Sequence, residues 1–115
     1  MLLNLSNHPY ASWSKEQQER ATLDYQRVTD LPFPNVRPDL SSEELDALVE
    51  EYIEKIFALN PAAVHIMGEM NFTFRTVSQL EAKGILCLAS TTERITTIEN
   101  NVRTSHFKFV QFRIY

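Results

Sequence analysis

The residues best suited to chemistry gather in three short polar segments: Ser6-Asn7-His8, Gly68-Glu69-Met70-Asn71 and Ser90-Thr91-Thr92-Glu93-Arg94. Each segment follows a run of apolar residues. His8 can exchange a proton near neutral pH, and Arg94 can pair with a phosphate group. Serine, threonine and asparagine side chains add hydrogen-bond donors and acceptors. The three segments therefore form the candidate site, provided that the fold brings them together.

The segment around Gly68 supports more than one kind of chemistry. A helix predicted to begin near Asn71 would offer free backbone amides to an anion. Glu69 places a negative charge beside that position, and could instead bind a ribose hydroxyl, a base amino group or a metal ion. Its other interpretation is structural, because an acidic residue at a helix start stabilises the helix dipole. The sequence leaves these alternatives open.

No established motif narrows the chemistry. The chain has only two glycines and lacks the glycine-rich phosphate loops, the GxSxG nucleophile turn and the HExxH zinc motif. His65 lies inside an apolar run and is predicted to pack in the core, whereas His106 is predicted to be exposed. Three dispersed histidines do not predict a metal site, and we expect no cofactor. Cys87, the only cysteine, is predicted to be a buried, reduced thiol.

Hydrophobic periodicity and capping signals predict alternating strands and helices. Strands are expected at 2–6, 27–31, 63–67 and 85–89, and helices at 14–25, from 41 or 42 to 59, and at 71–83. Three prolines between residues 32 and 38 predict a stiff loop that could form a wall of the site.

The C-terminal part changes character. Residues 90–94 are predicted to form a polar loop. After it, residues 95–99 and 102–115 are predicted to pair as a hairpin that turns at Asn100-Asn101. The alternation of apolar residues shifts by one at Phe109-Val110, which indicates either a β-bulge or a strand covered on both faces.

This element order predicts a single α/β domain over residues 1–115. We expect a Rossmann-like, open, mostly parallel sheet with strand order 2-1-3-4, helices on both faces and the C-terminal hairpin at the edge. The order of such a sheet reverses between strands 1 and 3, and ligands bind there outside the carboxyl ends of the strands. The three polar segments should meet at that point.

The net charge of −4 argues against a surface that binds double-stranded nucleic acid. The chain begins without the basic and apolar regions of a signal peptide, and no run approaches the roughly 20 apolar residues needed to span a bilayer. We therefore expect a cytoplasmic protein with no membrane contact.

The three polar segments resemble those of the small Rossmann-like proteins associated with type III CRISPR systems, which are similar to CARF ligand-binding domains and include ring nucleases. The resemblance implies a homodimer that binds a cyclic oligoadenylate second messenger. It leaves open whether the ligand is also cleaved, which in the ring nucleases of the group proceeds without a metal through attack of the ligand's 2′-hydroxyl. It implies His8 as an acid or base and Arg94 as a phosphate clamp. The ligand contacts that it implies are Ser6, Asn7, Gly68, Glu69, Asn71, Ser90, Thr91 and Thr92.

Two other functions fit the same residues. The chain could be a non-catalytic Rossmann-like interaction module, with Trp13, Phe33 or the phenylalanine-rich hairpin as its protein interface. It could also be a small transferase or hydrolase that uses His8 and Glu69.

Overall fold

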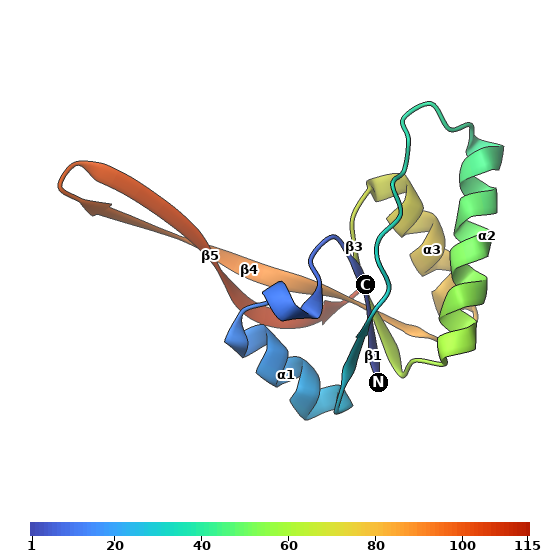
Figure 1. Ribbon diagram of the computed structural model, residues 1–115, viewed down its shortest axis with the longest axis horizontal. Helices are drawn as coiled ribbons and strands as arrows, with labels where there is room; N and C mark the ends of the chain where they lie inside the picture. Colours follow the sequence, from blue (N-terminus) through green and yellow to red (C-terminus); the bar gives the residue numbers. More distant parts are fainter.

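The computed structural model describes residues 1–115, and it confirms the predicted α/β class and the mostly parallel sheet. Five strands lie in the order β2-β1-β3-β4-β5, and only the β4–β5 pair is antiparallel (Figure 1). The strands are β1 (Leu2–Ser6), β2 (Val28–Asp30), β3 (Ala63–Met67), β4 (Leu86–Glu99) and β5 (Val102–Ile114). The helices are α1 (Lys15–Tyr25), α2 (Ser42–Leu59) and α3 (Met70–Ala82), with a short 3₁₀ turn, η1 (Tyr10–Ser12), before α1.

The helices begin where their capping residues predict. Ser14 caps α1 by accepting a hydrogen bond from the amide of Gln17. Ser41 caps α2 in a reciprocal capping box with Glu44, which satisfies two amides that the helix itself leaves free. Helix α2 ends at Asn60, which adopts the left-handed conformation. No helix is both long enough and apolar enough to cross a membrane.

Helices cover both faces of the sheet because alternate strand residues point to opposite sides. On one face, Leu3 and Leu5 of β1 and Val64 and Ile66 of β3 pack in a cluster with α2 and α3. On the other face, the strand residues Leu2, Ala63 and Leu88 point toward α1. There they form a smaller cluster with Trp13 and Ala21. The α1 face also receives the polar residues of the central strands, which are Asn4, Ser6 and His65.

The prediction of a loop at residues 90–94 was wrong, because β4 continues through them without a break to Glu99. Thr91 and Thr92 pair with Gln111 and Phe109 of β5. The segment contains neither glycine nor proline, and threonine favours an extended backbone, so its polarity marks exposure rather than a turn. The separate strand predicted at residues 95–99 is therefore the outer part of β4.

The outer parts of β4 and β5 form a two-stranded ribbon that leaves the body of the molecule (Figure 1). We call residues 92–109 the β-arm. The turn at its tip is made by Asn100 and Asn101, both with positive φ (50° and 64°), as a tight hairpin turn requires. At its base the register shifts between Thr91 and Thr92, which leaves Val110 outside the pairing. The bulge, rather than two covered faces, explains the change of alternation.

Candidate functional site

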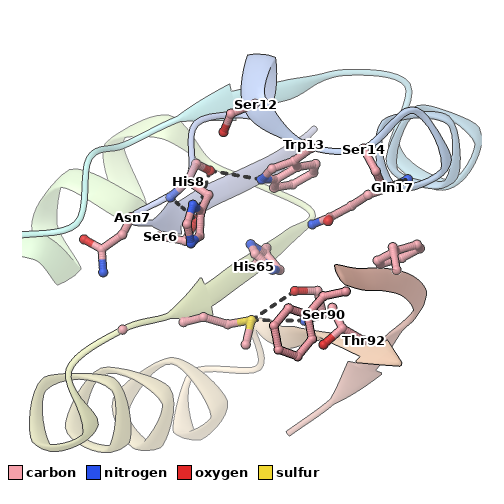
Figure 2. A pocket seen from close by; sticks show the side chains of 14 residues that line it. Ser6, Asn7, His8, Ser12, Trp13, Ser14, Gln17, His65, Ser90 and Thr92 are labelled. Carbon is pink, nitrogen blue, oxygen red and sulfur yellow. Dashed lines mark hydrogen bonds between the residues drawn. The ribbon is translucent and has the colours of Figure 1, made fainter. Parts of the chain in front are cut away.

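A cavity of about 570 Å³ opens on the α1 face, at the carboxyl ends of β1 and β3 and against the base of the β-arm (Figure 2). Its lining contains no aspartate, glutamate, lysine or arginine. The only titratable side chains are two histidines, and the remainder are hydroxyl, amide, aromatic and methionine side chains and one glycine. The lining residues are Ser6, Asn7, His8, Ser12, Trp13, Ser14, Gln17, His65, Met67, Gly68, Ser90, Thr92, Phe107 and Phe109.

The sequence makes this cavity by placing polar residues at the ends of apolar strands. Ser6 on β1 and His65 on β3 point away from the α2–α3 cluster, so they face the side covered by α1. Trp13 lies just before α1 and packs against the sheet with only 8% of its surface exposed. On the other side of the opening, Phe109 and Phe107 stand on the same face of the β-arm as Thr92.

A hydrogen-bond network around Asn4 organises the cavity floor. The Asn4 amide nitrogen donates to the His8 carbonyl and to the Asp30 carboxylate, each at 2.8 Å. The Asn4 side-chain oxygen accepts from the Ser6 hydroxyl at 2.8 Å and lies 3.0 Å from Nδ1 of His65. Both polar ends of Asn4, which is 1% exposed, are therefore used within the protein.

The backbone of His8 is held in place by the same network. Its carbonyl oxygen accepts from Asn4 and also from the indole nitrogen of Trp13 at 3.0 Å, and its amide donates to the Ser6 hydroxyl. Pro9 follows, with φ −63° and an extended ψ. The imidazole of His8 itself remains exposed at the cavity wall (Figure 2), where it can meet a bound molecule.

His65 is buried, as predicted, but it also belongs to the cavity. The ring lies edge-on to Trp13 and Phe112, with centroid separations of 5.1 and 5.6 Å. Burial lowers the pKa of His65 to about 4, because desolvation disfavours the charged imidazolium. Its Nε2 atom has no hydrogen-bond partner. The cavity therefore has a neutral imidazole at its floor.

The family was identified from the sequence. A family model described as "Uncharacterized protein MJ1673 family" matches residues 1–113. The chain belongs to the MJ1673 family. No curated protein and no solved structure matches it.

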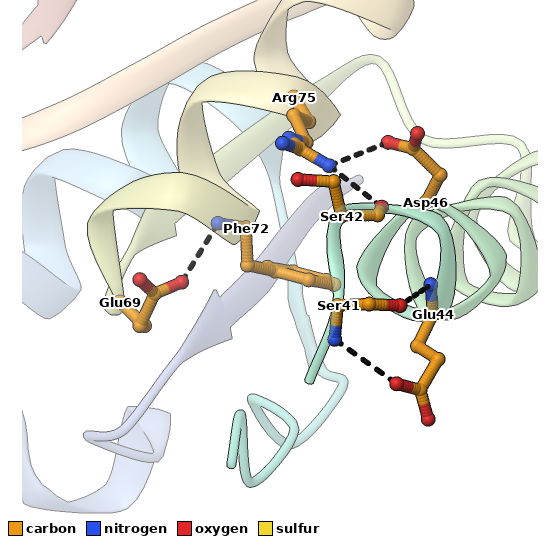
Figure 3. A network of polar contacts seen from close by, with 7 residues as sticks. All are labelled: Ser41, Ser42, Glu44, Asp46, Glu69, Phe72 and Arg75. Atoms are coloured by element: carbon orange, nitrogen blue, oxygen red, sulfur yellow. Dashed lines mark hydrogen bonds and ion pairs between the residues drawn. The ribbon is translucent and has the colours of Figure 1, made fainter. Parts of the chain in front are cut away.

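In this MJ1673-family chain, four predicted site residues lie outside the cavity, and two of them are at the start of α3. Glu69 and Asn71 instead border a separate hollow beside Arg75 and the start of α2. The Glu69 carboxylate caps α3, accepting from the amides of Asn71 at 3.0 Å and Phe72 at 2.8 Å (Figure 3). These bonds lower the pKa of Glu69. Of the alternatives left open for this segment, the structural one accounts for these amides, because the protein's own carboxylate occupies them.

Arg75 has a structural position in the same region. Its guanidinium donates to the Asp46 carboxylate at 2.8 Å and to the Ser42 carbonyl at 3.0 Å (Figure 3). The ion pair joins α3 to the first turns of α2, while the capping box of Ser41 and Glu44 lies beside it. This cation is engaged within the protein and does not line the cavity.

Gly68 lines the cavity of the MJ1673-family chain, but a packing contact explains why the residue is glycine. A Cβ atom at this position would lie 2.3 Å from Cζ of Phe33, closer than real contacts allow. Phe33 comes from the proline-rich loop and packs edge-on against Phe72. That loop therefore supports the junction between β3 and α3 and does not line the cavity.

The predicted residues of the 90–94 segment are divided by the alternation of β4. Ser90 and Thr92 line the cavity, whereas Thr91 lies between them in the strand, outside the lining, and its hydroxyl donates to the Gln111 carbonyl. Arg94 shares the face of Thr92 but lies farther along the β-arm, where its guanidinium donates to the Ser105 hydroxyl at 3.3 Å. Arg94 therefore does not line the cavity, although it stands on the same side of the arm.

Sequence reasoning missed more than half of the lining. Trp13 lies just before α1 and Gln17 lies in its first turn, whereas Phe107 and Phe109 come from the arm. A signal for His65 was present, because a histidine in an otherwise apolar strand must find a polar partner or face a polar space. The same reasoning applies to Asn4 in β1.

Proposed function

We propose that this protein binds a cyclic oligoadenylate, with one adenosine unit held in the cavity of each chain. The observation that carries the proposal is the uncharged lining of the cavity, which combines aromatic rings with hydrogen-bonding groups. A volume of about 570 Å³ lies within the usual range for small-ligand sites. The strand order and helices on both faces support the finer assignment of a Rossmann-like, CARF-like fold.

The lining suits a nucleoside better than a free phosphate. Phe107, which is 69% exposed, offers an aromatic face against which a base can stack, and the mostly buried Trp13 borders the same cavity. Ser6, Gln17 and Ser90 can exchange hydrogen bonds with a base edge or a ribose. No cation lines the cavity, so the phosphates of the ligand would stay near its opening, where Arg94 is the arginine on the matching face of the arm.

A homodimer would place two such cavities around one cyclic ligand. The first turns of α3 carry an apolar patch at the same edge of the sheet, with Met70 81% and Phe74 70% exposed. Met67 and Tyr115 border the same apolar hollow. Exposed apolar patches of this kind mark protein interfaces. We assign this patch, defined as Met67, Met70, Phe74 and Tyr115, to the contact between the two copies.

The dimer is tested by replacing Phe74→Glu and measuring mass in solution. A charge at the centre of the patch should convert the dimer to a monomer. Leu23→Glu is the matched control, because Leu23 is 77% exposed on α1, away from the patch. A wild-type monomer, or a dimer that survives Phe74→Glu, would contradict this interface.

We further propose that the bound ligand is cleaved without a metal. The 2′-oxygen of one ribose forms a bond to the adjacent phosphorus, and the bond from phosphorus to the 5′-oxygen breaks. The products are a 2′,3′-cyclic phosphate and a 5′-hydroxyl, so the proton lost by the 2′-hydroxyl is balanced by the one gained at the 5′-oxygen. His8, exposed at the cavity wall, is our candidate for proton transfer, and Arg94 for stabilising the phosphate charge.

The experiment is incubation with cyclic tri-, tetra- and hexa-adenylate in EDTA, with calorimetry for binding and chromatography for products. The proposal predicts binding of at least one ring, and linear products that end in a 2′,3′-cyclic phosphate. His8→Ala and Arg94→Ala should each slow cleavage by more than about tenfold while the ligand still binds. Unchanged rates would reject those two roles, and the absence of binding by a folded dimer would reject the function.

The β-arm supports a second candidate, a protein-interaction module. Ile98 and Phe107 are 73% and 69% exposed on the ribbon. A two-stranded ribbon is marginally stable by itself in water, so contact with another protein would stabilise it. The arm carries three basic and two acidic residues, so its net charge is +1. Because the whole chain has a net charge of −4, the rest of the chain has a net charge of −5. This candidate predicts no cyclic oligoadenylate binding at any ring size, together with an arm whose amides are protected from hydrogen exchange only when the partner is present.

A further inference from the structure

The hydrogen bonds of Asn4 determine which nitrogen of His65 carries a proton. The His8 carbonyl and the Asp30 carboxylate can only accept, so the Asn4 group that faces them at 2.8 Å must be its NH₂. The opposite end of Asn4, which faces His65, is then the oxygen. Since that oxygen lies 3.0 Å from Nδ1 of His65, Nδ1 must carry the hydrogen and donate it. A neutral imidazole has one N–H, so Nε2 is a bare acceptor.

This bare acceptor is left without a partner at the floor of the cavity. His65 is 2% exposed, and no side chain, backbone group or neighbouring element donates to its Nε2. Buried polar atoms are almost always paired in folded proteins, and leaving one unpaired costs stability. Rotation of the ring would break the hydrogen bond between Nδ1 and Asn4. It would also disturb the edge-on packing of the ring against Trp13 and Phe112.

We propose that His65 is a specificity-determining residue whose Nε2 accepts a hydrogen bond from the adenosine unit held in the cavity. This inference rests on the proposed function. It specifies that Nε2 recognises an N–H or O–H donor of the ligand. An adenosine unit has two donors of this kind, the 6-amino group of the base and the 2′-hydroxyl of the ribose. Asn4 and Asp30 are positioning residues in this contact, since they act on it through the tautomer of His65.

Gln17 is the lining side chain that we expect to move when the contact forms. Nε2 has almost no accessible surface in the empty cavity, so the ligand reaches it only when a lining side chain moves. In Figure 2 the Gln17 side chain extends from α1 toward the His65 ring. Its amide makes no hydrogen bond in the structure, whereas the backbone of Gln17 is fixed by Ser14. The Gln17 side chain can therefore move at small cost.

The tautomer is tested first, in the free protein, by nitrogen-15 NMR of the histidine rings. The inference predicts that one of the three histidines remains neutral, with its proton on Nδ1, at pH 6. A proton on Nε2 of His65 would overturn the inference, because that nitrogen could then not accept.

The ligand contact is tested with wild-type protein and matched cyclic ligands. One analogue replaces adenine by purine and lacks the 6-amino group, and the other replaces one ribose at a time by 2′-deoxyribose. We expect one analogue to bind about tenfold more weakly or worse, because it leaves Nε2 buried without a donor. The analogue that loses affinity identifies which donor His65 reads.

His65→Phe provides the matched variant, because phenylalanine keeps an aromatic ring between Trp13 and Phe112 but has no acceptor. In this variant the natural ligand and the weakened analogue should bind within about twofold of each other. A wild-type protein that binds the natural ligand and both analogues equally would overturn the role of His65 alone. A wild-type protein that binds none of them would overturn the proposed function and this inference with it.

Discussion

Acid should destabilise this protein through His65, between pH 7 and pH 5. In the native state burial lowers the pKa of His65 to about 4, against an ordinary value of 6.5. As the pH falls below 6.5, the imidazole of His65 is protonated in the unfolded state but stays neutral in the native state. The free energy of unfolding therefore decreases. The difference between the two pKa values corresponds to about 3.4 kcal/mol at full protonation. About 2 kcal/mol of this is lost between pH 7 and pH 5.

The assay is urea unfolding at pH 7 and pH 5, followed by the fluorescence of the single tryptophan. Trp13 contacts His65, so it reports on the same part of the core. Wild-type protein should lose about 2 kcal/mol more of its unfolding free energy over this range than His65→Phe does. His106→Gln is the control, because His106 is exposed on the β-arm, and this variant should behave like wild type. Equal losses in wild type and His65→Phe would refute the reasoning about burial.

Three further predictions follow from single contacts. Gly68→Ala should destabilise the fold by about 1–3 kcal/mol, because its Cβ would meet Phe33 at 2.3 Å; Phe33→Leu in the same chain should recover part of the loss, as measured by urea unfolding. Glu69→Ala should cost about 1 kcal/mol, since the amide of Phe72 loses its cap, yet ligand affinity measured by calorimetry should be unchanged. Cys87 is 1% exposed, and burial raises its pKa to about 11, so iodoacetamide at pH 8 should label it only after unfolding; rapid labelling of native protein would contradict its burial.

The body of the fold could be predicted because local signals and long-range packing agree in it. Ser14 and Ser41 cap the two helices that their sequence positions indicate. Gly84, one of only two glycines in the chain, follows α3 and has φ +78°, the left-handed conformation in which glycine commonly ends a helix. The apolar positions of α2 repeat with the helix period, and four of them, Leu45, Val49, Ile53 and Ile56, are buried.

The outer hairpin of the β-arm could be predicted from its turn at Asn100-Asn101, but the continuation of β4 through residues 90–94 could not. Polar residues at 90–94 are typical of a loop, and also of a strand exposed to solvent on both faces. What distinguishes the two is pairing with residues 107–112, a contact between distant segments that no local signal encodes. This pairing decides which of these side chains line the cavity. Alternate residues of a strand point to opposite faces, so Ser90 and Thr92 line the cavity and Thr91 does not.

The candidate site was predicted in part for a similar reason. The carboxyl ends of β1 and β3 meet in any parallel sheet, so Ser6, Asn7 and His8 could be assigned to one edge. Whether Glu69 pointed into that space or toward its own helix depended on side-chain geometry, and the helix amides proved to be its partners.

The central claim is that the cavity holds an adenosine unit, and Trp13 tests it most directly. This residue is the only tryptophan in the chain and it lines the cavity. Titration with cyclic tri-, tetra- and hexa-adenylate should change its fluorescence in a saturable way for at least one ring, with one ring bound for every two chains. Fluorescence that stays unchanged at all three ring sizes, in protein shown to be folded and dimeric, would contradict the account.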